Sequence, residues 1–108
     1  MKIVLAHSDT TYTRHLKIFF LEKGVTDIHI FSNGFPTLKH IIQHRSNIVI
    51  IEENLPGLNA EDIKSALIFK HIKPEIITIS AFQKIPPSTI IKKIKTQFSL
   101  DKLIPNKL

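Results

Sequence analysis

Three short apolar runs of the sequence each end in polar side chains that could do chemistry. These side chains are His7, Ser8 and Asp9 after the first run, Glu52 and Glu53 after the second, and Ser80 after the third. An imidazole together with carboxylates suits a transition ion such as Zn²⁺ or Mn²⁺, so His7, Asp9 and Glu52 could form a metal site. The alternative, which we favour, is that His7 pairs with a neighbouring acid and binds no metal.

The sequence excludes several other kinds of site. It has no cysteine, and therefore no thiol nucleophile, disulfide or cysteine-based zinc site. Its three glycines all stand at expected turns, so there is no glycine-rich phosphate loop. The serines and the six histidines do not follow the order of a nucleophilic triad, and no G-x-S-x-G elbow occurs. We therefore expect no enzymatic activity.

One further pair of histidines lies away from these runs. His40 and His44 are four residues apart in an expected helix, so they could share a metal ion or titrate together. The sequence indicates no other ligand near them, and we interpret the pair as exposed side chains.

An alternation of strands and helices must position these residues. The expected strands are Lys2–Ala6, Ile28–Phe31, Ile48–Ile51, Glu75–Ser80 and Leu100–Ile104. The first expected helix runs from Asp9 or Thr10 to about Lys23, and the second has Pro36 in its first turn. A third helix is expected from Asn59 to about His71, and a fourth begins at a cap provided by Ser88 or Thr89. Such alternation favours an α/β fold with a parallel sheet covered by helices on both faces. The carboxyl ends of the first, third and fourth strands would then meet at one edge, where a site is expected.

Length and composition limit the class of protein. The 108 residues fit one compact domain, 1–108, and 43% of them are hydrophobic, which suffices for a core. No apolar stretch approaches the length of a membrane span, and the amino terminus becomes polar too early for a signal peptide. We therefore expect a cytoplasmic protein.

Positive charge is concentrated in the second half of the chain. Residues 1–62 carry six basic and seven acidic side chains, whereas residues 63–108 carry nine lysines and two acids. A nucleic acid or a membrane surface is one possible partner for such a distribution. We favour a solvated lysine-rich face, because the lysines are scattered and no aromatic residues alternate with them to stack on bases.

Several segments, in the right order, resemble a response-regulator receiver domain of the chemotaxis-regulator type. They are Lys2–Asp9, the turn Ser32-Asn33-Gly34, the segment Leu55-Pro56-Gly57-Leu58-Asn59-Ala60, and Ile76–Ala81. The resemblance covers the chain except its end. It implies a flavodoxin-like sheet of five strands in the order 2-1-3-4-5, with the last helix of the family missing. It also implies a role in two-component (phosphorelay) signal transduction.

The residues at the phosphorylation site depart from the family pattern. The position of the phosphoacceptor aspartate, four residues before Pro56, holds Glu52, and the acidic pair that helps to bind Mg²⁺ is replaced by His7 and Ser8, with Asp9 displaced. Ser80 matches the family hydroxyl. The family lysine corresponds to Lys102 by counting from Ser80, whereas the strand pattern places Pro105 there and leaves Lys107 as another candidate.

The resemblance therefore implies a pseudo-receiver that works through protein–protein interaction with a histidine kinase, a receiver or an output protein. Glu52 is either a fixed mimic of phosphoaspartate or a solvated carboxylate retained after the chemistry was lost. We expect no cofactor beyond weak Mg²⁺ binding. The alternatives are a metal-binding receiver with residual phosphoacceptor activity and a basic regulator that binds nucleic acid.

Overall fold

The computed structural model of the chain describes residues 1–81, 85–90 and 92. Its centre is a sheet of four strands, β1 (Lys2–Ala6), β2 (Asp27–Phe31), β3 (Ile48–Glu52) and β4 (Glu75–Ile79). Their order is β2-β1-β3-β4, and every neighbouring pair is parallel. This confirms the expected order for four strands. The expected fifth strand, Leu100–Ile104, lies outside the described residues.

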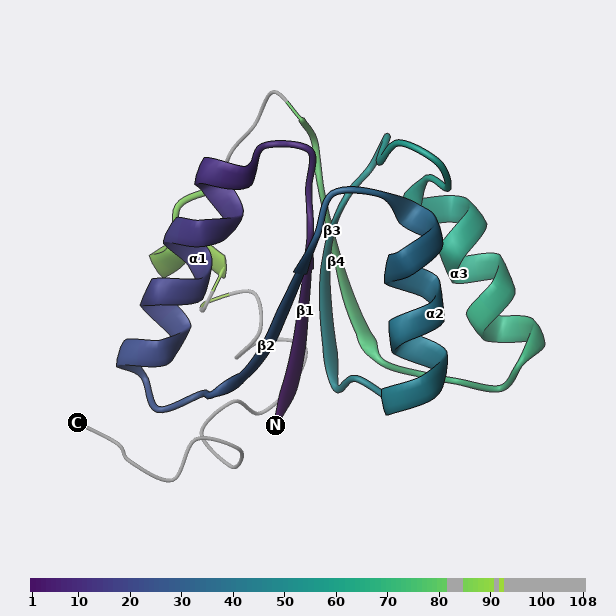
Figure 1. Cartoon of the computed structure of the whole chain (residues 1–108), viewed down its shortest axis with the longest axis horizontal. Coiled ribbons are helices and arrows are strands. Elements are labelled where there is room, and N and C mark those ends of the chain that lie inside the picture. Colours follow the sequence, from purple (N-terminus) through teal and green to yellow (C-terminus); the bar gives the residue numbers. More distant parts are fainter. Residues whose placement is uncertain (82–84, 91, 93–108) are drawn as a thin grey trace.

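The helices cover both faces of the sheet. On one face lies α1 (Thr10–Glu22), and on the other lie α2 (Gly34–His44) and α3 (Ala60–Phe69), as Figure 1 shows. In the part of the chain that the structure describes, no helix is long and apolar enough to cross a membrane.

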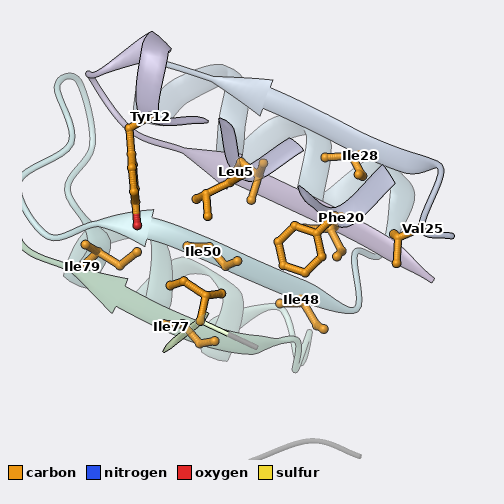
Figure 2. Close-up of a cluster of buried hydrophobic side chains, with 12 residues drawn as sticks. Leu5, Tyr12, Phe20, Val25, Ile28, Ile48, Ile50, Ile77 and Ile79 are labelled. Carbon is orange, nitrogen blue, oxygen red and sulfur yellow. The ribbon is translucent and has the colours of Figure 1, made fainter. Parts of the chain in front are cut away.

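Each face of the sheet has its own core. On the α1 face, Phe20 packs against strand residues such as Leu5, Ile50 and Ile79 (Figure 2). Leu16 of α1 belongs to the same core. On the other face, Ile41 of α2 packs together with Ile63 and Leu67 of α3. These helix residues cover the alternate side chains of two strands, Val4 and Ala6 of β1 and Val49 and Ile51 of β3. β3 is buried along its whole length, as expected for a central parallel strand.

The helix ends follow local capping signals. Asp9 is the N-cap of α1, Asn33 that of α2, and Asn59 forms a capping box with Asp62 at the start of α3. Gly24 follows the end of α1 with a φ of 90°, a conformation that favours glycine.

The predicted cap of the next helix is wrong by one or two residues. Residues 87–90 are already helical, and the N–H groups of Thr89 and Ile90 donate to the carbonyl of Pro86 at 3.0 and 3.1 Å. Pro87 therefore stands in the first turn, where its fixed φ suits the helix and its missing N–H costs no hydrogen bond. Ser88 and Thr89 lie inside the helix.

Candidate functional site

The predicted site residues gather at the carboxyl edge of the sheet. Glu52 is the last residue of β3 and pairs in register with Ile79, the last residue of β4. His7 directly follows β1, and its N–H donates to the carbonyl of Phe31 at the end of β2 (3.0 Å). This edge is where the topology of a parallel sheet places a binding site.

Glu52 is held at this edge by Ser8. The backbone N–H of Ser8 donates to Oε1 of Glu52 at 2.8 Å, and the Ser8 hydroxyl donates to the same oxygen at 2.6 Å. Glu52 is only 3% exposed, whereas Ser8 is an exposed residue. Both hydrogen bonds converge on one oxygen of the carboxylate. Glu52 is therefore a buried, tethered carboxylate and not a solvated one.

His7 lies beside the same carboxylate. Its Nδ1 is 3.4 Å from Oε1 of Glu52, and the N–H of Asp9 donates to this Nδ1 at 3.0 Å. A nitrogen that accepts a hydrogen bond has a lone pair and no hydrogen, so this arrangement corresponds to a neutral ring with its hydrogen on Nε2. His7 therefore lies next to an acid, as expected. In this tautomer, however, Nδ1 has no hydrogen to donate to Glu52.

Asp9 serves the adjacent helix. Its Oδ1 accepts hydrogen bonds from the N–H groups of Thr11 (3.0 Å) and Tyr12 (3.1 Å), which is the geometry of an N-cap. Among the described residues, no group of three or more His, Asp or Glu side chains is arranged to hold a metal ion.

The remaining predicted residues are placed only in part. Ser80 and Ala81 follow β4 directly, so Ser80 stands one residue beyond the partner of Glu52 in the register. Lys102 and its rivals Pro105 and Lys107 lie outside the described residues.

Tyr12 is a member of this site that sequence reasoning did not identify. Its ring meets the ring of His7 edge to face, with centroids 5.1 Å apart. Its hydroxyl donates to the carbonyl of Ile85 at 2.6 Å, and burial raises the pKa of Tyr12 to about 12. The sequence places Tyr12 in the first expected helix, and nothing there shows that its hydroxyl reaches a segment 73 residues away.

Comparison with known proteins finds similarity in structure alone. No protein-family model matches the sequence, and no curated protein matches it. Solved structures of receiver domains are similar over most of the chain. The response regulatory domain of protein mrkE from Klebsiella pneumoniae has 15% identity and a TM-score of 0.71, with 95% of this chain and 99% of that chain covered. A DNA-binding response regulator of the LuxR family from Staphylococcus aureus has 18% identity and a TM-score of 0.68, with 96% and 92% covered. These likenesses show a receiver-type fold.

Proposed function

We propose that this chain is a response-regulator-like protein of two-component (phosphorelay) signalling that binds a protein partner without being phosphorylated at Glu52. In this pseudo-receiver, Glu52 is a fixed negative charge at the place where a receiver carries its phosphoacceptor. The receiver-type fold supports the first part of the proposal. The geometry at Glu52 supports the second.

The observation that carries the proposal is the pair of hydrogen bonds from Ser8 to Glu52. A carboxylate that attacks phosphorus must offer an accessible oxygen, and Oε1 already accepts from the N–H and the hydroxyl of Ser8. The carboxylate is buried, and its Oε1 could attack only after losing both bonds. Ser8 therefore stabilises the charge in one position and opposes its use as a nucleophile.

The residues near Glu52 give little support for bound Mg²⁺. Mg²⁺ takes oxygen ligands, and the two positions after β1 hold His7, an imidazole, and Ser8, whose hydroxyl donates to Glu52. The carboxylate of Asp9 accepts from the α1 backbone. Without a metal to offset charge repulsion, a phosphate donor would meet an uncompensated carboxylate. We propose no enzymatic activity and no required cofactor.

The partner in this proposal is a signalling protein, namely a histidine kinase, a receiver or an output protein. A permanent charge at the sheet edge would hold the domain in one state, so binding would be constitutive. The chain would then compete with a true receiver for that partner.

The first test is a backbone amide NMR spectrum recorded with and without Mg²⁺ and a small phosphate donor. We expect no new species and no shifts clustered at His7 to Asp9, Glu52 and Ser80. A stable phosphorylated species, or Mg²⁺-dependent shifts at these residues, would overturn the proposal in favour of residual phosphoacceptor activity.

A second test addresses the fixed charge. Glu52→Gln keeps the shape and an oxygen that can accept from Ser8, but removes the charge. In binding assays against purified histidine kinases, receivers and output proteins, we expect Glu52→Gln to weaken a complex at least about tenfold, ~1.4 kcal/mol. Glu22→Gln removes one negative charge from an exposed position at the end of α1. This variant is the control and should bind as wild type does. Equal binding by both variants would show that the charge is a remnant without a role.

A further inference from the structure

Three histidines form a row on the α2 side of the sheet, at its β2 edge. The ring centroids of His29 and His40 are 4.3 Å apart, and those of His40 and His44 are 4.4 Å apart. His40 therefore lies between two other imidazole rings, and the ring centroid of Phe31 is 5.2 Å from that of His40. We call His29, His40 and His44 the histidine row.

The row joins two elements. Side chains alternate along a strand, so Asp27, His29 and Phe31 of β2 share one face, and α2 covers that face with His40 and His44. The sequence indicated the pair on α2. It did not indicate His29, although the alternation along β2 contains the signal.

No metal arrangement accounts for the row, since the described residues contain no group of three such side chains set to hold an ion. Besides binding metal ions, imidazole rings take up protons near neutral pH. Neutral rings can pack on one another and on Phe31, whereas two protonated rings at these distances repel each other.

The charged groups around the row act in both directions. On β2, Asp27 lies 3.0 Å from Nε2 of His29, and its negative charge favours protonation of His40. On β1, the ammonium group of Lys2 donates to the carbonyl of His44 at 2.9 Å, and its positive charge opposes protonation of His40. Burial lowers the pKa of His40, the rings of His29 and His44 lower it further, and Asp27 only partly opposes them.

We propose that the histidine row is a proton-sensitive joint between β2 and α2, closed when its rings are neutral and loosened when neighbouring rings take up protons. Because the pKa of His40 is lowered in the folded chain, the stabilising effect of its neutral form is present above the ordinary value of 6.5. It is lost as the pH falls below that value and through the lowered pKa of His40 in the folded chain. The row therefore stabilises the β2–α2 edge at neutral pH and destabilises it in mild acid. This inference does not depend on the proposed function.

Loosening this joint would also affect the site. The first residue of α2, Gly34, donates its N–H to the carbonyl of Pro56 at 2.7 Å, in the loop that follows Glu52. A change in the seating of α2 would therefore reach the loop beside the carboxylate.

The test is an NMR titration of the imidazole resonances, with amide protection factors measured at about pH 7.5 and about pH 5.5 in the presence of a chelator. We expect His40 to titrate below its ordinary value of 6.5. We also expect protection in the second half of α2 to fall in acid by about tenfold more in wild type than in His40→Gln, ~1.4 kcal/mol.

His15→Gln is the matched control and should leave the acid response of α2 unchanged. Should His40→Gln fold poorly, His44→Gln removes one neighbour from a more exposed position and should raise the pKa of His40 toward its ordinary value. The proposal is overturned if His40 titrates at or above its ordinary value of 6.5, or if α2 loses the same protection in wild type and in His40→Gln.

Discussion

At the scale of single residues, the carboxyl edge of the sheet depends on one serine. The Ser8 hydroxyl lies 2.6 Å from Oε1 of Glu52, a distance typical of an O–H···O bond to an ionised acceptor. Glu52 is buried, so loss of this donor leaves its Oε1 less well satisfied.

Ser8→Ala removes the hydroxyl and keeps the backbone N–H that donates to the same oxygen. We expect the free energy of unfolding to fall by about 1–3 kcal/mol, the range for a hydrogen bond to a charged group that is left partly unsatisfied. Urea unfolding at neutral pH measures this loss. Ser65→Ala, an exposed substitution on α3, is the control and should change stability by less than about 0.5 kcal/mol. A Ser8→Ala variant as stable as that control would contradict the tether.

The sequence predicted which residues share this edge, and it did not predict their contacts. The sequence predicted that His7, Ser8 and Glu52 lie at one edge, because the carboxyl ends of parallel strands meet there. The hydrogen bonds of Ser8 depend on the direction of the chain after β1, which no local signal encodes. Asp9 was a candidate metal ligand because the sequence alone does not distinguish an aspartate that caps a helix from one that binds a metal ion.

At the scale of elements, two loops contact each other where α2 begins. A Cβ added to Gly34 would collide with the carbonyl oxygen of Leu58 and lie 2.6 Å from its backbone nitrogen. A Cβ on Gly57 would lie 2.5 Å from the side-chain oxygen of Asn33. The Ser32–Gly34 turn and the Pro56–Leu58 turn therefore pack backbone to backbone, and glycine is required for the close approach.

Gly34→Ala should separate these two loops. Because the obstacle is backbone, it cannot rotate away, and we expect a loss of stability of about 3 kcal/mol, the upper part of the range for overpacking. Thermal or urea unfolding measures it, and amide shifts should change in residues 53–60. Gln43→Ala, exposed on the same helix, is the control. Unchanged stability of Gly34→Ala would show that the loops do not approach each other this closely in solution.

The elements themselves were predictable to within one or two residues, since each has a local signal. Asn59, where a helix was expected to begin, forms a capping box with Asp62, and Gly24 directly follows the expected end of the first helix. The error after β4 has a physical reason. Ser88 and Thr89 are good caps, but Pro87 is a better first helical residue, and the two signals overlap in one short segment.

At the scale of the whole molecule, residues 85–90 belong to the α1 face. Ile90 is completely buried in the same core as Phe20 and Leu5, and Ile85 packs against it. The hydrogen bond from Tyr12 to the Ile85 carbonyl joins this segment to α1 near the site. Within the described residues, the Tyr12 hydroxyl therefore adds a hydrogen bond to the apolar packing between α1 and the segment after β4.

This phenol should make the fold sensitive to alkali. Burial raises the pKa of Tyr12 from 10.0 to about 12. An acid whose pKa is raised on folding stabilises the folded state below its unfolded value, and the contribution is lost as the pH rises through the folded value. We therefore expect stability to decline between about pH 10 and pH 12 as the buried hydroxyl is forced to ionise.

Tyr12 is the only tyrosine of the chain and there is no tryptophan, so the ultraviolet spectrum of the phenolate reports on this residue alone. The phenolate should appear near pH 12 in the folded chain and near pH 10 in urea. Tyr12→Phe should lose about 1 kcal/mol at neutral pH, because the hydrogen bond to Ile85 is gone. It should also lose less stability than wild type as the pH rises through this window, whereas the lysines titrate equally in both. A folded-state transition near pH 10 would mean that the hydroxyl is in water, and residues 85–90 would then not be joined to α1 through Tyr12.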